Sequence, residues 1–91
     1  MADLKRWFSK GDYEVEIEGI KIKIPPFGVD QMSSILKVTK DTDEKKQAEG
    51  LKELVRYVLK YNFPDLKEDE FRKISPKVIG EIANAITQSL Q

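Results

Sequence analysis

The fold is decided by the stretch from Tyr13 to Ile24, which reads YEVEIEGIKIKI. Its first half alternates apolar residues with glutamates, and its second half alternates isoleucines with lysines. Successive side chains of a β-strand point to opposite faces, so this alternation is typical of two half-buried strands. The sequence therefore predicts a β-hairpin with one apolar face and one charged face.

The turn of the hairpin is expected at Glu18-Gly19, because glycine adopts a positive φ without steric cost. A two-residue turn there sets the register of the strands. The facing pairs are then Ile17–Ile20, Val15–Ile22 and Tyr13–Ile24 on the apolar face, and Glu16–Lys21 and Glu14–Lys23 on the charged face. Apolar contact and opposite charge favour the same register. Because an isolated hairpin is marginal in water, its apolar face must pack on the helices that follow.

Helical signals follow the second strand, which Pro25 and Pro26 bring to an end. The apolar spacing predicts helices over about residues 29–37, 43–62, 68–73 and 76–90. The order of strand, strand and then helices leaves no place for a parallel sheet. The predicted fold class is α+β, with an N-terminal antiparallel β-hairpin packed on a small bundle of three to four helices.

Several residues mark the ends of these helices. Asp41 is followed three residues later by Glu44, a spacing that resembles a capping box for the second helix. Ser75 and Pro76 predict the start of the last helix, with serine as the N-cap and proline at the first helical position. Gly50 lies inside the second helix, where it is expected to cost up to about 1 kcal/mol relative to alanine.

The apolar positions of these elements predict one hydrophobic core. In the first helix, the residues expected to face inward are Val29, Met32, Ile35 and Leu36. The core as a whole is expected to consist of Val15, Ile17, Ile20, Ile22, Leu36, Leu51, Leu54, Val55, Val58, Leu59, Phe71, Ile82 and Ile86.

The composition argues against catalysis. The chain has no Cys and no His, which removes thiolate nucleophiles, thiolate metal sites and the commonest general base. None of its serines lies in a Gly-x-Ser-x-Gly elbow, and its five glycines are too scattered to form a phosphate-binding loop. We therefore expect a protein that is not an enzyme, with no catalytic residue, no cofactor and no metal site.

Charge and hydropathy bear on partners and location. Sixteen Lys and Arg residues balance 16 Asp and Glu residues, so no basic region is available to release counterions from nucleic acid. No apolar run reaches the roughly 18–20 residues that span a bilayer, and the first residues are too charged for a signal peptide. We expect a cytoplasmic protein that binds neither nucleic acid nor a membrane.

The first eleven residues differ from the rest of the chain. We expect residues 1–11 to form a flexible N-terminal arm and residues 12–91 to form a single α+β domain. The arm contains Leu4, Trp7 and Phe8, whose spacing corresponds to about one helical turn. Two interpretations stay open: Trp7 packs on the edge of the same domain, or Trp7 and Phe8 dock on a protein partner.

The last helix has an apolar arc that is wider than its own core requires. A helix on the surface of a domain needs an arc of a little over 100° to face the core. The margin of the arc consists of Ile79, Ala83 and Leu90. We expect these three residues to form an apolar strip for self-association or for a client helix, unless the hairpin and the long helix cover the whole arc.

From Tyr13 onward the layout resembles the tail assembly chaperones of long-tailed bacteriophages and prophages. The resemblance is carried by the Glu/Lys hairpin, by Pro26-Phe27-Gly28, and by residues 63–76, FPDLKEDEFRKISP. In this last segment a helix ends at a proline, a short acidic helix follows, and Ser-Pro opens the final helix. Lys67 departs from the pattern, because a serine or threonine cap is expected at its position.

The resemblance implies a protein-binding function without nucleotide or metal. Such chaperones are thought to coat the long, aggregation-prone tape measure protein and keep it soluble while the tail tube polymerises around it. They also tend to self-associate, and a phage protein of this kind works in the cytoplasm of the host cell.

Two other classes of function stay open. One is a small adaptor or a virion structural protein. The other is a DNA-binding regulator, because residues 68–73 and 76–90 form a helix, a turn and a helix. The second of these helices offers Lys77 as its only basic residue, so phosphate contact would be weak.

Overall fold

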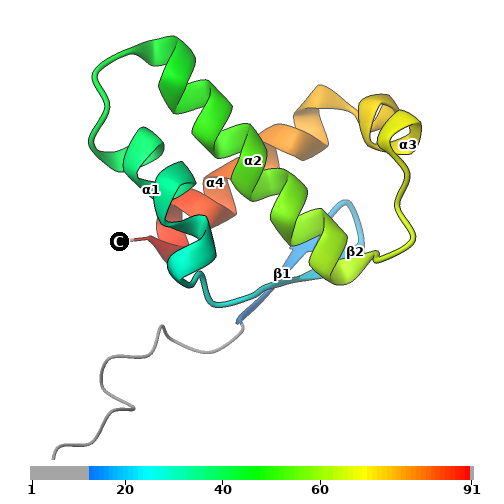
Figure 1. Ribbon diagram of the computed structural model, residues 1–91. Coiled ribbons are helices and arrows are strands. Elements are labelled where there is room, and N and C mark those ends of the chain that lie inside the picture. The colour runs from blue at the N-terminus through cyan, green and yellow to red at the C-terminus, as the bar shows by residue number, and fades with distance from the viewer. Residues whose placement is uncertain (1–12, 91) are drawn as a thin grey trace, which may run out of the picture.

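The computed structural model describes residues 13–90, an antiparallel hairpin followed by helices (Figure 1). The strands are β1 (Tyr13–Ile17) and β2 (Ile20–Ile24). A 3-10 turn, η2 (Val29–Gln31), leads into the helices, which are α1 (Met32–Thr39), α2 (Glu44–Asn62), α3 (Glu68–Lys73) and α4 (Pro76–Ser89). The predicted α+β class is confirmed. The expected N-terminal arm, with Trp7 and Phe8, lies outside the described residues.

The register of the hairpin is the predicted one, with Ile17 opposite Ile20 and Tyr13 opposite Ile24. Glu18 and Gly19 form the turn with φ values of 50° and 81°, which match the right-handed twist of the strands. The ion pair that forms between the strands is diagonal, since Lys21 Nζ lies 4.0 Å from Glu14 Oε1. The ion pair thus joins diagonal neighbours of the predicted register and not the directly facing residues.

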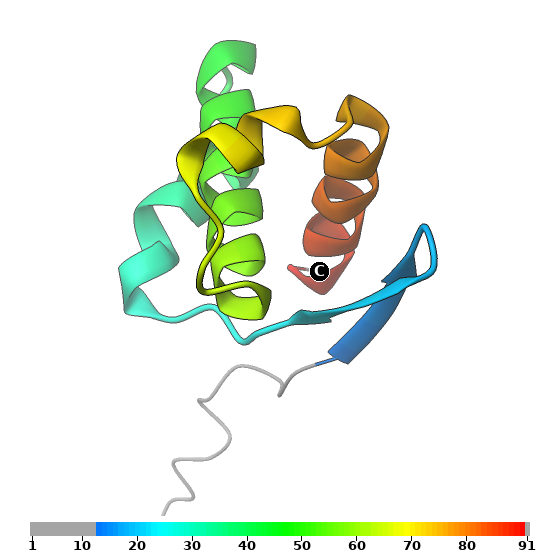
Figure 2. The same cartoon turned by 90° about the vertical axis from the view of Figure 1, so that its right-hand side faces the viewer.

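The helices are arranged around α2. On one side α2 packs against α4, and both helices contact the hairpin, while α1 packs on the other side of α2 (Figure 2). At the turn of the hairpin, Glu18 Oε1 lies 3.3 Å from Lys77 Nζ of α4. At the far end, Arg56 Nη2 of α2 donates to Glu68 Oε1 of α3 at 2.8 Å, and its guanidinium lies 4.7 Å from the centre of the Phe71 ring. These contacts attach the hairpin and α3 to the two long helices.

The core lies between the hairpin, α2 and α4. Its buried apolar residues are Ile17, Ile22, Ile24, Leu54, Val55, Val58, Leu59, Phe71, Ile82, Ala85 and Ile86. Ile24 and Ala85 are additions to the predicted core, and Val15 and Leu51 are only partly buried at its edge.

Two members of the predicted core are wrong. Ile20 is 56% exposed, because it is the first residue after the turn, where neighbouring elements cover Ile17 but not Ile20. Leu36 is 47% exposed. It lies on α1, which packs mainly on α2 and therefore has one covered side and one open side.

The predicted bounds of α2, α3 and α4 hold within one residue, whereas α1 begins at Met32 and not at about residue 29, because residues 29–31 form the 3-10 turn η2. The cap of α2 differs from the expected capping box. The N-cap is Asp43, whose Oδ1 accepts from Lys45 N at 3.0 Å. Asp41 instead accepts from Asp43 N at 2.8 Å and forms the turn before the helix. Ser75 is the N-cap of α4, as predicted, and its Oγ accepts from Lys77 N at 3.3 Å.

The start of α3 explains how Lys67 replaces the serine or threonine expected there. Lys67 has no side-chain acceptor to offer, and Glu70 Oε1 accepts from Lys67 N at 3.0 Å instead. The side chain at the third helical position thus bonds to the backbone of the N-cap residue, as in a capping box, but the N-cap side chain makes no bond in return.

A candidate protein-binding face on α1

The position of α1 on α2 depends on a glycine. A Cβ atom at Gly50 would lie 2.7 Å from the carbonyl oxygen of Ser34, 2.7 Å from Lys37 Cβ and 3.2 Å from Val38 Cγ2. One of these atoms belongs to the backbone, so relief would require α1 to move. Gly50 therefore allows the two helices to approach closely, which is why a weak helix former stands inside α2.

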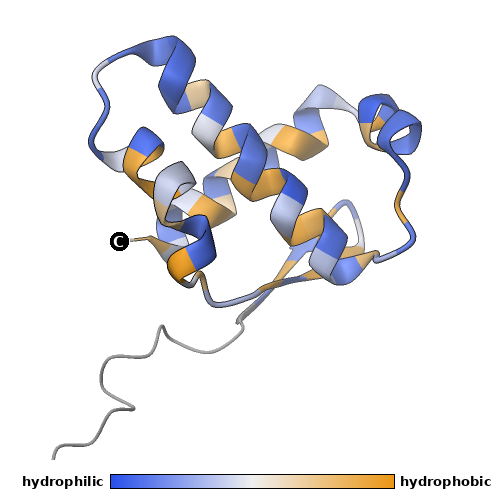
Figure 3. Cartoon of the chain, in the orientation of Figure 1, coloured by the Kyte–Doolittle hydropathy of each residue, from blue (hydrophilic) through white to orange (hydrophobic). Residues whose placement is uncertain are grey.

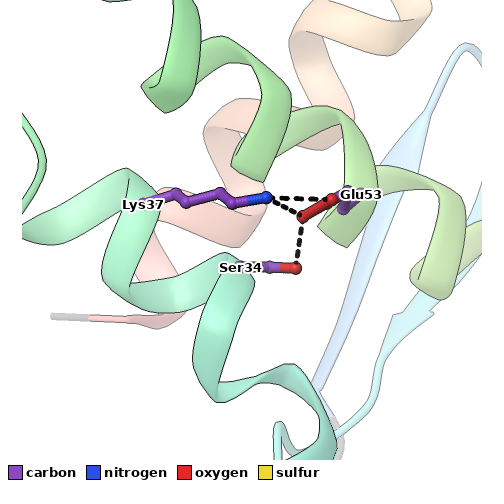
Figure 4. A network of polar contacts seen from close by, with 3 residues as sticks. All are labelled: Ser34, Lys37 and Glu53. Carbon is purple, nitrogen blue, oxygen red and sulfur yellow. Dashed lines mark hydrogen bonds and ion pairs between the residues drawn. The ribbon is translucent and has the colours of Figure 1, made fainter. Parts of the chain in front are cut away.

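Three polar side chains join the same two helices (Figure 4). Ser34 Oγ donates to Glu53 Oε1 at 2.7 Å, and Lys37 Nζ donates to Glu53 Oε2 at 3.3 Å. The hydrogen bond from Ser34 lowers the pKa of the Glu53 carboxyl, and the bond and charge of Lys37 lower it further, against desolvation, which raises it. The network fixes the rotation of α1 about its axis, because Ser34 and Lys37 must both face Glu53.

This rotation directs one side of α1 inward and the other outward. Ile35 and Val38 pack against the core, although no residue of α1 is fully buried. On the adjoining side Met32 is 49% exposed and Leu36 is 47% exposed, and Val29 of η2, just before the helix, is 85% exposed. The expectation that these three residues face inward is therefore wrong. We call Val29, Met32 and Leu36 the outer α1 face.

The outer α1 face is continuous along the helix. At about 100° per residue, its three members fall within about 60° of one another. Figure 3 shows apolar residues recurring along η2 and α1 between polar ones. An open pocket of about 570 Å³ lies on this side of the molecule and is lined by Met32, Ser33, Leu36, Lys37, Lys40 and Asp41. The face thus has an apolar centre, a depression and a charged border.

The chemistry that this arrangement offers is apolar contact. An apolar centre with a polar rim is the usual composition of a protein interface. The thioether of Met32 adapts to differently shaped partners. Among residues 14–90, no polar or charged side chain is buried, and in the part of the chain that the structure describes no cluster of acidic residues could hold a metal ion.

The predicted strip on α4 occupies a different position. Ile79, Ala83 and Leu90 are each partly buried and pack against the core. The large hydrophobic residues that the described chain exposes include Val29, Met32 and Leu36. They do not include Ile79, Ala83 or Leu90. The binding role of the α4 strip stays a prediction, and α1 offers more apolar surface.

Sequence reasoning missed the outer α1 face because it assigned Val29, Met32 and Leu36 to the inward side together with Ile35. A signal was present in the spacing. At about 100° per residue, one apolar arc of about 180° contains Val38, Ile35, Met32, Leu36 and Val29. One neighbouring helix cannot bury so wide an arc, so one margin of it remains for solvent or for a partner.

Comparison with known proteins adds no identification. No family model matches the chain, and neither a curated protein nor a solved structure matches it. Within residues 13–90, no helix is both long and apolar enough to cross a membrane.

Proposed function

We propose that this chain is a non-enzymatic protein-binding protein that holds an apolar helix of its partner on the outer α1 face. The partner class that we propose is a tape measure protein, so that the chain acts as a tail assembly chaperone in the cytoplasm of the host cell. The exposed apolar stripe of Val29, Met32 and Leu36 is the observation that carries the binding proposal.

The size of the stripe suits reversible binding. Complete burial of a Val, Leu or Met side chain contributes about 1.5–3 kcal/mol relative to full exposure. Met32 and Leu36 are already half-covered, so a partner gains less than this from each of them. A chaperone of a growing assembly has to release its client, and a small apolar face with few anchors meets that requirement.

The stripe also lies on a helix whose position is fixed before a partner binds. Gly50 and the network of Ser34, Lys37 and Glu53 fix α1 on α2. A partner helix that lands on α1 therefore does not have to order it first, which lowers the entropic cost of binding. Amphipathic helices commonly dock on such surfaces through apolar residues at helical spacing.

The resemblance to tail assembly chaperones supports the choice of client. It rests on the Glu/Lys hairpin and on residues 63–76, in which a proline, an acidic short helix and a Ser-Pro start follow one another. The resemblance implies a client that is long and aggregation-prone until the tail tube polymerises around it. A chaperone for it needs an accessible apolar face more than a deep pocket.

Gene order and co-expression test the proposal together. We expect a tail tube gene upstream and a tape measure gene downstream of the gene for this chain. The neighbouring long protein should remain in the supernatant when it is co-expressed with the wild-type chain and should precipitate with Leu36→Glu. Ile20→Glu is the matched control, because Ile20 is equally exposed but lies on the hairpin.

Three outcomes would contradict the proposal. If the client stays in solution with Leu36→Glu, the outer α1 face is not required for client binding. A client that precipitates with Ile79→Glu or Ala83→Glu, while Leu36→Glu protects it, would assign binding to the α4 strip. A partner that binds through the outer α1 face without any change in its solubility would indicate an adaptor or a virion structural protein.

A further inference from the structure

The contacts of β2 show which backbone groups the hairpin directs outward. Lys23 N and Lys23 O both bond to the side chain of Asn62, the last residue of α2, so both point away from Glu14, which faces Lys23 across the ladder. In an antiparallel ladder, facing pairs that exchange backbone bonds alternate with pairs that do not. Glu14 and, two residues on, Glu16 therefore direct their N–H and C=O groups away from β2, to the outer edge of β1.

The two edges of the hairpin differ in what covers them. At the edge of β2, Asn62 takes the place of a neighbouring strand at Lys23. At the edge of β1, in the part of the chain that the structure describes, no hydrogen bond reaches the outward N–H and C=O groups of Glu14 and Glu16. Figure 2 shows β1 on the outside of the molecule, with β2 between it and the end of α2. The β1 edge is therefore open to an added strand.

The same residues make the β1 edge acidic. Glu14 and Glu16 are exposed, and Glu18 follows them in the turn. Glu14 has an ion partner in Lys21 at 4.0 Å, and Glu18 has one in Lys77 at 3.3 Å. The carboxylate of Glu16 forms no ion pair with any side chain of residues 13–90. A strand added at this edge thus meets a row of glutamates at alternate positions, one of them without a counter-charge.

A second copy of the hairpin suits this edge poorly. In an antiparallel pair, residues that exchange backbone bonds stand directly opposite each other, with Cα atoms about 5.5 Å apart and side chains on one face. Two copies of β1 would place glutamate opposite glutamate, and like charges directly opposite each other are destabilising. The β2 strand of a second copy carries lysines at alternate positions, but Asn62 already occupies its edge.

We infer that the β1 edge binds an extended segment of another protein that carries lysine or arginine at every second position. The segment pairs as a third strand of the sheet. The backbone of Glu14 and Glu16 supplies hydrogen bonds that any sequence can use, and their carboxylates select basic side chains on the exposed face. The intervening residues of the segment lie on the other face, with Val15 and Ile17, where α4 packs, and are expected to be apolar.

This site does not depend on the proposed function. The outer α1 face lies across α2 from the hairpin (Figure 2), so a partner on one surface leaves the other accessible. A helix is expected on α1 and an extended strand on β1, and the two differ in charge as well. The two surfaces can therefore be tested separately.

Short synthetic peptides and NMR of the full chain test the β1 edge. The probe is a peptide in which lysine alternates with valine. One control has glutamate in place of lysine. A second control keeps the lysines but has their backbone nitrogens methylated, so that it retains the charge and cannot donate to the ladder. Amide hydrogen exchange then reports pairing, and the shifts of the amide signals report affinity.

We expect the amides of Glu14 and Glu16 to exchange rapidly in the free chain and slowly with the lysine peptide. The amides of Val15 and Ile17, which point to β2, should not change. At low salt the lysine peptide should bind about tenfold more tightly than the glutamate peptide, because opposite charges replace like charges at both positions. Added salt should reduce this ratio, since the charges are exposed.

Paired variants separate the charge of the edge from the charge of the whole protein. Glu14→Gln with Glu16→Gln should abolish the preference for lysine, and circular dichroism would verify that the fold is kept. Glu44→Gln with Glu49→Gln makes the same change of charge at the far end of α2 (Figure 1) and should keep the preference. Leu36→Glu on α1 should leave peptide binding unchanged.

Four results would overturn the inference. They are equal affinity for the lysine and glutamate peptides, equal affinity for the methylated peptide, and no binding of any peptide. The fourth is protection of the Glu14 and Glu16 amides that rises with protein concentration when no peptide is present, because it would show that a second copy occupies the edge. None of these results changes the outcome of co-expression with Leu36→Glu, so the two proposals fail independently.

Discussion

One asparagine side chain at the end of α2 joins the hairpin to the helices. Asn62, the last residue of α2, accepts from Lys23 N at 2.8 Å and donates to Lys23 O at 2.9 Å. Its Nδ2 also donates to Val58 O at 2.8 Å. The side chain thus gives β2 the pair of backbone partners that a third strand would provide, and its bond to Val58 O holds it against its own helix. Nothing in the residue pattern indicated this contact, because the two residues lie 39 positions apart.

Asn62→Asp should destabilise the fold by about 1–3 kcal/mol, because a carboxylate keeps the acceptor but places a charge against two carbonyl oxygens. Urea denaturation followed by circular dichroism measures the change. Asn84→Asp on the exposed side of α4 is the matched control and should change the stability by less than about 0.5 kcal/mol. Equal effects of the two substitutions would show that the Asn62 side chain does not stabilise the hairpin.

At the scale of elements, substitution of two helical glycines distinguishes the effect of helix propensity on stability from the effect of helix packing. A Cβ at Gly50 would meet α1, whereas a Cβ at Gly80 in α4 has nothing within 4 Å. Gly80→Ala should therefore stabilise the protein by up to about 1 kcal/mol through propensity alone. Gly50→Ala should lower the midpoint of thermal unfolding, because overpacking of a helix contact costs about 1–3 kcal/mol and exceeds the gain in propensity. Stabilisation by both substitutions would contradict the close approach of α1 to α2.

The attachment of α1 should also depend on pH. The folded-state pKa of Glu53 is lowered by Ser34 and Lys37, so the network contributes stability above the pKa of the unfolded state. This contribution is lost as the pH falls from about 4, the usual range of a glutamate, through the lowered pKa. The effect is small because Glu53 is half-exposed.

Hydrogen exchange of the α1 amides measures this effect. At neutral pH, Glu53→Gln should exchange faster than the wild type in α1 and equally in α4. The difference between the two proteins should vanish in acid, where the wild-type carboxyl is protonated as well. A difference that persists at pH values where Glu53 is protonated would show that the charge of Glu53 is not its source.

The sequence predicted best where two independent patterns agreed. The hairpin register was predicted correctly, because the apolar pairs and the charge pairs both require it. Ser75-Pro76 predicted the start of α4, because cap and proline preferences coincide there. The orientation of α1 was predicted only in part: Ile35 packs against the core as expected, but Val29, Met32 and Leu36 are exposed. Hydropathy alone cannot tell which part of a wide apolar arc meets a neighbour. Gly50 and Glu53 decide that orientation, and their role depends on contacts between segments far apart in the chain.

At the scale of the whole molecule, the hairpin, α2 and α4 form the stable body, and α1 is an attachment on its side. The buried core residues belong to the hairpin, α2, α3 and α4, and none belongs to α1. Local opening is easiest for elements with few buried contacts. We therefore expect α1 to open before the rest of the domain, while in the native state Gly50 and the network of Ser34, Lys37 and Glu53 hold it in one position on α2.

The most direct test of binding through α1 is methyl NMR of the full chain during titration with fragments of the tape measure protein that we propose as its client. We expect the largest shifts at Val29, Met32 and Leu36, with little change at Ile79, Ala83 and Leu90. Ile20, equally exposed on the hairpin, serves as the internal control and should not shift. Shifts confined to α4, or no shifts at fragment concentrations that keep the client in solution, would contradict binding through the outer α1 face.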